Sequence, residues 1–159
     1  MERLTSVGFV LAIFVVAIVL FICEGTAAAS LGGDVSSVQA DQARLKATIQ
    51  VHDAQGYTVQ EMQPPGGTSV KEYLSSDGRV FAVSWRGPFL PDMQQILGSY
   101  FQQYSTAVHS EKAKRTGRAP LNIQQSGLVV QSGGHMRAYF GRAYIPGMLP
   151  AGVTPDEIK

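Results

Sequence analysis

The stretch DGRVFAVSW (Asp77–Trp85) decides the fold of this chain. Apolar side chains fill nearly every position from Val80 to Trp85, which is typical of a strand covered on both faces at the centre of a sheet. The preceding Asp-Gly pair favours a two-residue type I′ turn, in which both positions take positive φ. We therefore predict a hairpin that joins this strand to the one before it.

Other segments on both sides of this stretch alternate apolar with polar residues, or are rich in Tyr, Thr and Val, and so predict further strands. The other predicted strands are 45–51, 57–63, 68–74, 121–125, 127–131 and 136–145. Ser132-Gly133-Gly134 has the composition of a turn between the last two. Prolines from Pro146 onward indicate an irregular C-terminal tail.

A helix is predicted to begin at Pro91-Asp92, because proline fits the first helical turn and Asp92 favours the positive end of the helix dipole. Apolar residues then recur at three- and four-residue spacing from Met93 to Val108, which indicates an amphipathic helix of about five turns. The order of elements predicts one α+β domain over residues 30–159. We expect a mainly antiparallel sheet of about six strands, with one long amphipathic helix packed on one face and the tail beginning at about residue 146.

The first thirty residues are typical of an export signal. Val7–Ile22 is an apolar run, and Ala27-Ala28-Ala29 provides the small side chains that a signal peptidase reads. We predict a signal peptide at residues 1–29, cleaved after Ala29 or, alternatively, after Ala28, and hence a periplasmic or secreted protein. The run is intermediate in length between a signal and a membrane span, so retention would leave the domain membrane-anchored by residues 7–22. Lipid attachment at Cys23 is disfavoured by the bulky Ile22 before it.

Charge and cysteine content exclude several classes of function. The chain has 13 Lys and Arg against 12 Asp and Glu, and such a balance gives no strong field for nucleic acid. Its one cysteine lies in the predicted signal, so the mature chain is expected to lack disulfides, thiol nucleophiles and cysteine-based metal sites. The basic cluster at residues 111–118 is interpreted as the end of a helix, with Gly117 as its cap.

At this point three stretches carry a resemblance to a bacterial family known as domain of unknown function 2844. These stretches are VFAVSWRGPFLPD (80–92), LGSYF (97–101) and GLVVQSGGHMR (127–137), and LGGD (31–34) fits as well. The resemblance covers nearly all of the predicted mature chain and implies a bacterial exported protein. The family has no established activity, so it implies no catalytic residues, cofactor or ligand.

No residue pattern in the chain indicates catalysis or a cofactor. There is no metalloprotease motif, nucleophile elbow or phosphate-binding loop, and the carboxylates are not paired. Gly133-Gly134-His135-Met136 invites a copper interpretation, but one imidazole and one thioether are too few ligands. We therefore predict no metal site and no cofactor.

A binding surface is the better candidate, because arginine and aromatic side chains together are typical of binding hot spots. The candidate residues are Trp85, Arg86, Phe89, His135, Arg137, Tyr139 and Arg142. The plainer interpretation is that one face of these strands is core while the arginines extend to water.

Two functions remain open. The first is a non-catalytic binding or accessory protein of the cell envelope, whose partner is a protein, a polymer or a small ligand. The alternative is a small hydrolase-like enzyme that uses His135 and Ser132, which is motivated only by the Ser-Gly-Gly-His sequence. Contact with a membrane is expected only through an uncleaved signal.

Overall fold

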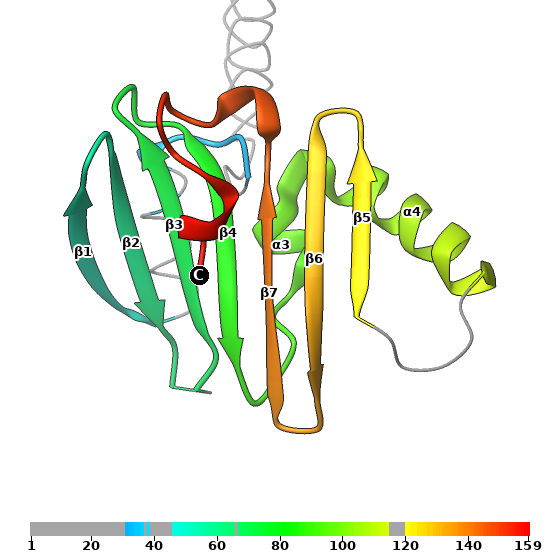
Figure 1. The fold of residues 1–159 in the computed structure, drawn as a ribbon. Helices are drawn as coiled ribbons and strands as arrows, with labels where there is room; N and C mark the ends of the chain where they lie inside the picture. The colour runs from blue at the N-terminus through cyan, green and yellow to red at the C-terminus, as the bar shows by residue number, and fades with distance from the viewer. Residues whose placement is uncertain (1–30, 37, 39–45, 66, 115–119) are drawn as a thin grey trace, which may run out of the picture.

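The computed structural model describes residues 31–36, 38, 46–65, 67–114 and 120–159, without the side chains of 111–114. The predicted signal peptide at residues 1–29, with its alternative anchor and Cys23, lies outside these residues, as do residues 115–118 of the basic cluster, including the predicted cap Gly117. The strands are β1 (Thr48–Ala54), β2 (Tyr57–Gln63), β3 (Ser69–Ser75), β4 (Val80–Gly87), β5 (Leu121–Gln125), β6 (Leu128–His135) and β7 (Ala138–Tyr144). They form one antiparallel sheet in the order β1-β2-β3-β4-β7-β6-β5 (Figure 1).

Strand β4 occupies the middle of this sheet, as its apolar sequence predicts. It pairs with β3 on one side and β7 on the other, and every residue from Val80 to Trp85 is buried. The hairpin before it is also confirmed, but its predicted turn type is wrong. Gly78 has φ 77 and Asp77 does not have positive φ, while Gly78 N–H donates to the carbonyl of Ser75 at 2.8 Å. The loop is therefore a tight turn followed by a left-handed glycine.

The predicted α+β architecture with one long helix is wrong. The described chain is mostly sheet, with seven strands where about six were expected. The helical segment is divided into α3 (Met93–Leu97), a 3₁₀ turn (Gly98–Tyr100) and α4 (Phe101–Lys114). The division falls at Gly98, whose φ of 50 and ψ of −121 end the first helix after five residues. Asp92 does cap this helix, because its carboxylate accepts hydrogen bonds from Gln94 N and Gln95 N at 2.9 and 3.2 Å.

The predicted turn at Ser132-Gly133-Gly134 is also wrong. These three residues lie inside β6, and the hairpin turn consists of Met136 and Arg137, where Arg137 has φ 65. The two strands of this hairpin pair from His135↔Ala138 to Val129↔Tyr144. The glycines are therefore positions within a strand, and they shape its surface.

The two faces of the sheet are covered differently. Helices α3 and α4 lie behind the sheet in Figure 1, and their buried residues join the main core; we call this side the helix face. The opposite side, the open face, carries the C-terminal segment after β7 in front of β3 and β4. Ile158 of this segment is buried in a smaller core with Tyr73, Phe81 and Ala82. Among the described residues, no comparable segment covers the open face of β7, β6 and β5, and the candidate site lies there.

Candidate functional site

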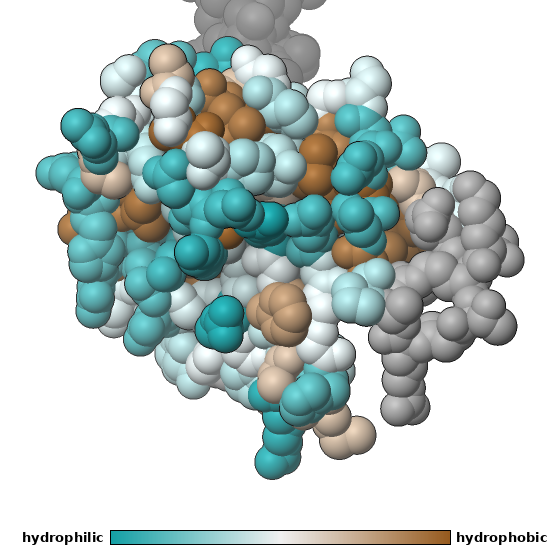
Figure 2. All heavy atoms as spheres, in the orientation of Figure 1, coloured by the Kyte–Doolittle hydropathy of each residue, from teal (hydrophilic) through white to brown (hydrophobic). Residues whose placement is uncertain are grey.

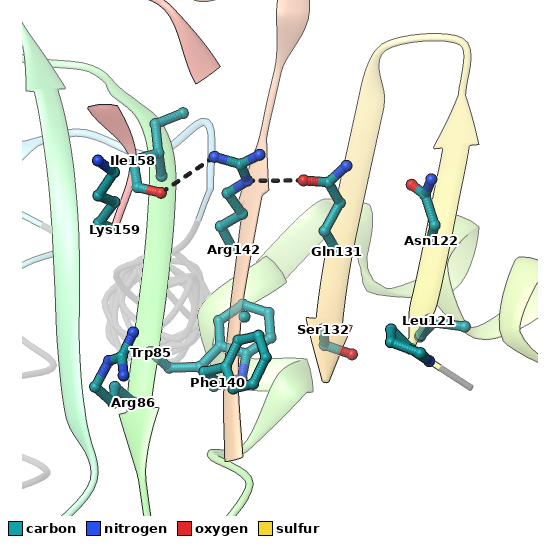
Figure 3. Close-up of a pocket in the computed structure, with 12 residues that line it drawn as sticks. Trp85, Arg86, Leu121, Asn122, Gln131, Ser132, Phe140, Arg142, Ile158 and Lys159 are labelled. Atoms are coloured by element: carbon teal, nitrogen blue, oxygen red, sulfur yellow. Dashed lines mark hydrogen bonds between the residues drawn. The ribbon is translucent and has the colours of Figure 1, made fainter. Parts of the chain in front are cut away.

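A hollow of about 460 Å³ lies on the open face where β4, β7, β6 and β5 meet the C-terminal segment. We call it the front groove. Its lining residues are Trp85, Arg86, Pro120, Leu121, Asn122, Gln131, Ser132, Phe140, Gly141, Arg142, Ile158 and Lys159 (Figure 3). Its volume lies within the usual range of small-molecule sites.

One side of the groove is a row of residues centred on Phe140. Arg86 on β4 pairs in register with Phe140 on β7, which in turn pairs with Gly133 on β6. The guanidinium of Arg86 lies 5.9 Å from the centroid of the Phe140 ring, a cation–π contact. A Cβ at Gly133 would lie 3.0 Å from Cζ of Phe140, so the glycine makes room for the tip of the ring. The ring remains 48% exposed and forms an apolar surface in the groove.

The other side is a polar row two residues further along the same strands. Arg142 on β7 pairs with Gln131 on β6, and Gln131 pairs with Asn122 on β5. Arg142 Nε donates to Oε1 of Gln131 at 2.7 Å, as Figure 3 shows. Because this bond occupies the amide oxygen, it fixes which end of the Gln131 amide is the donor. The row therefore offers orientated amide groups next to the aromatic surface.

The C-terminal segment forms the wall of the groove nearest β3. Arg142 Nη1 donates to the carbonyls of Pro155 and Ile158, the latter at 3.5 Å, while Nη2 lies 3.6 Å from Asp156. These contacts of Arg142 hold the wall in place.

Within the same segment, hydrogen bonds from the backbone N–H and the hydroxyl of Thr154 lower the pKa of the Glu157 carboxyl.

The charged side chains among the described lining residues of the groove are all cationic. Arg86, Arg142 and Lys159 line it, and no Asp or Glu is among its lining residues. Arg142 is engaged internally, whereas among the described residues Arg86 and Lys159 have no hydrogen-bonded or ion-paired partner for their cationic groups. In Figure 2, hydrophilic residues form a band across the middle of this face, above a small hydrophobic patch. The groove can therefore accept an anion beside an apolar surface.

Trp85, a predicted binding residue, is a core residue. It is 2% exposed and belongs to the core on the helix face, so it supports the groove from beneath. Its neighbour in register is Gly141, where a Cβ would lie 2.3 Å from Cζ2 of Trp85. Gly141 is therefore required for the indole to pass under β7. Trp85 Nε1 is buried and has no hydrogen-bond partner among the described residues.

The remaining predicted residues fall into three places. Arg86 and Arg142 lie in the front groove, on its two sides. His135, Arg137 and Tyr139 line a second hollow at the β6–β7 turn, which shares Arg86 and Phe140 with the groove. Phe89 is apart from both: it is 62% exposed and lines a hollow next to α3 with Pro64, Ile96 and others.

The structure does not bring Ser132 and His135 together, as the predicted hydrolase-like site would require. Both residues are on β6, three positions apart, and residues at odd spacing on a strand point to opposite faces. The partner of His135 in the ladder is Ala138, and its Nδ1 lies 3.3 Å from the carbonyl of Met136. In the part of the chain that the structure describes, no cluster of three or more His, Cys, Asp or Glu side chains is placed to hold a metal ion.

Sequence reasoning misses Asn122, Gln131 and Lys159 as groove residues. Their proximity depends on the register of β5 on β6 and on where the C-terminal segment crosses the sheet. Phe140 can be identified from sequence as a candidate groove residue, because it lies two positions from Arg142 on the same face of a strand that is not wholly apolar.

The chain belongs to the family described as "Protein of unknown function (DUF2844)", which it matches over residues 27–158. The matched region includes every strand of the sheet and every lining residue of the front groove except Lys159. No curated protein and no solved structure gives a significant match. Within the described ranges, no helix is both long enough and apolar enough to cross a membrane.

Proposed function

We propose that this chain is a non-catalytic binding protein of the bacterial cell envelope, and that its front groove binds a small anionic ligand with an apolar portion. The observation that carries the proposal is the pairing of Arg86 with the half-exposed ring of Phe140 in a groove whose described lining residues include three cationic side chains and no Asp or Glu side chain. Arginine beside an exposed aromatic ring is the composition of a binding hot spot.

Export is supported by the sequence alone. The apolar run Val7–Ile22 followed by Ala27-Ala28-Ala29 predicts a signal peptide, so the domain works outside the cytoplasm, in the periplasm or the medium. Determination of the N-terminal residue of the protein from its producing cells tests this. A start at Ser30 or Ala29 supports release, whereas an intact Met1 contradicts it and supports a domain anchored by residues 7–22.

A binding role is favoured over catalysis by the arrangement of the groove. Among its described lining residues, the ionisable side chains are those of Arg86, Arg142 and Lys159, and there is no His, Cys, Asp or Glu. General acid–base catalysis at neutral pH favours a group whose pKa is near 7. Ser132 and His135, the alternative catalytic pair, project from opposite faces of β6, so the hydrolase-like function has no geometric support.

The proposal is tested with a fluorescent probe that has the expected chemistry. Anilinonaphthalene sulfonate joins aromatic rings to an anionic group, and its emission rises when it is bound. We expect Arg86→Met to raise the dissociation constant of the dye about tenfold, because a charge-assisted hydrogen bond is lost. Phe140→Ala should weaken binding to a similar degree, since it removes the apolar surface.

Arg79→Met is the matched control, because Arg79 is an exposed arginine outside the groove. It changes the net charge by the same amount as Arg86→Met, so any general effect of charge appears in both. Equal dye affinity in the wild type, Arg86→Met and Phe140→Ala would overturn the proposed site. Melting temperatures of all variants exclude binding to partly unfolded protein.

A further inference from the structure

The polar row of the front groove is more specific than an anion site needs. Asn122 and Gln131 are paired across β5 and β6, so their side chains leave the same face of the sheet at adjacent positions, about 5 Å apart. Each amide has both a donor and an acceptor group. A simple carboxylate or sulfonate bound by Arg86 would leave the Gln131 NH₂ group and the Asn122 amide without a ligand partner.

We propose that the ligand of the front groove is an acidic saccharide of the uronic acid type, an inference that rests on the proposed binding function. Three features of one sugar acid match three features of the groove. Its carboxylate matches the free cations, its neighbouring hydroxyls match the two amides, and the C–H groups of its ring match the exposed face of Phe140.

The carboxylate is assigned to Arg86, which lies beside Phe140, while Lys159 adds a positive charge at the C-terminal wall of the groove (Figure 3). Arg142 is the third cation of the groove, but Nε and Nη1 already donate to Gln131, Pro155 and Ile158. Arg86 and Lys159 keep their donors for a ligand, as far as the described residues show. A planar guanidinium with free donors is the side chain best suited to a carboxylate.

The hydroxyls are assigned to the amide row. A hydroxyl both donates and accepts one hydrogen bond, and an amide side chain can match it in either role. Arg142 holds the oxygen of Gln131 at 2.7 Å, so its NH₂ group is left as a donor, while Asn122 is exposed and unpaired among the described residues. Neighbouring hydroxyls of a sugar have a spacing that two adjacent amides can follow.

The sugar ring is assigned to Phe140. Aromatic faces carry partial negative charge, and they attract the weakly positive C–H groups of a flat apolar surface. Gly133, the cross-strand neighbour of Phe140, places no side chain beside the ring, so this part of the groove stays open to a sugar ring.

Extended peptides fit this groove less well. They bind to sheets by adding a strand at an edge, where backbone groups are unpaired. The front groove lies on the face of the sheet, over β7 and β6, whose backbones are already paired on both sides. A nucleic acid is disfavoured by the near-neutral charge of the chain.

Displacement of the bound dye from the purified protein tests the inference. We expect trigalacturonate to displace anilinonaphthalene sulfonate at least tenfold more effectively than maltotriose, a neutral trisaccharide, and than benzoate, an anion without hydroxyls. Asn122→Leu should weaken the binding of trigalacturonate about tenfold relative to the binding of the dye, whose affinity is measured directly in the same variant. Gln124→Leu is the matched control, because Gln124 is an exposed amide two residues along β5 and outside the groove.

The outcomes separate this inference from the proposed function. If the dye binds through Arg86 but benzoate competes as well as trigalacturonate, the groove is an anion site and the saccharide assignment is wrong. Equal competition by trigalacturonate in the wild type and in Asn122→Leu overturns it too. If the affinity for the dye does not depend on Arg86 or Phe140, the proposed function is wrong, and the inference is wrong with it.

Discussion

The hydroxyl of Tyr73 on β3 bonds to both backbone polar groups of Lys159, which lies 86 positions later in the sequence. It donates to the carbonyl of Lys159 and accepts from its N–H, each at 2.8 Å. The same hydroxyl lies 3.3 Å from the hydroxyl of Ser84 on β4. One buried phenol therefore joins the C-terminal segment to the two central strands.

Removal of this hydroxyl should loosen the C-terminal segment. Tyr73→Phe leaves the backbone groups of Lys159 without their partner, and we expect a loss of about 1–3 kcal/mol in the free energy of unfolding. Thermal unfolding measures the loss, and hydrogen exchange should show faster exchange in the segment from Thr154. Tyr144→Phe is the control, because the Tyr144 hydroxyl has no hydrogen bond to a described residue. Identical melting temperatures for the two variants would contradict the prediction.

Replacement of Gly141 should be strongly destabilising. A Cβ there would lie 2.3 Å from Cζ2 of Trp85 and 2.8 Å from the carbonyl of Gln131. We expect Gly141→Ala to cost about 1–3 kcal/mol through displacement of the indole, and to lower the melting temperature by about 3–5 °C per kcal/mol. Gly147→Ala is the control, because nothing lies within 4 Å of its Cβ position and its φ is not positive. If both variants lowered the melting temperature equally, the loss of stability would come from replacing glycine as such and not from the contact with Trp85.

A charge at Leu97 should disrupt the core on the helix face. Leu97 is fully buried with Val83, Trp85 and other core residues, so Leu97→Asp places an unpaired carboxylate among apolar side chains. The expected cost is several kcal/mol, enough to unfold a domain of ordinary stability. Gln94→Asp, on the exposed side of the same short helix, should change the stability little. Circular dichroism on heating measures both, and an unchanged melting temperature for Leu97→Asp would be inconsistent with the packing of α3.

Acid should weaken the pairing of β2 with β3. A hydrogen bond from the Ser69 hydroxyl at 2.8 Å, with smaller contributions from Gln63 and Lys71, lowers the pKa of the Glu61 carboxyl below its usual 4.5. A depressed folded-state pKa stabilises the fold above pH 4.5, and this stabilisation is lost as the pH falls through the folded-state value. NMR titration of the carboxyl measures its pKa directly. We expect the pKa to rise towards its usual value in Ser69→Ala, and an unchanged titration would show that Ser69 does not stabilise the carboxylate.

The central strand was predictable because its signal is local. Val80 to Trp85 is apolar on both sides, and a strand with both faces covered requires that pattern wherever it lies in the chain. The cap at Asp92 is local in the same way. By contrast, the break at Gly98 does not interrupt the spacing of apolar residues, so periodicity alone predicts one long helix.

The site was only partly predictable because its geometry depends on contacts between distant strands. Arg86 is found from sequence because aromatic residues flank it. Gln131 is an ordinary polar residue until the register of β7 on β6 places it beside Arg142. Gly133 and Gly134 suggest a turn from sequence alone, because glycine is common in turns. Glycine inside a strand can instead mark the close approach of another group, and here Gly133 accommodates the ring of Phe140.

The order of the strands also determines at which stage of folding the front groove forms. β1 to β4 are consecutive neighbours, as are β5 to β7, and the two sets meet only where β4 pairs with β7. That pairing joins Gly87 to Tyr139 and Ala82 to Tyr144, more than fifty positions apart, and such long-range contacts form slowly. Arg86 comes from the first set and Phe140 from the second. A chain that has not yet formed this seam has no groove, so binding in the groove would report the completed fold.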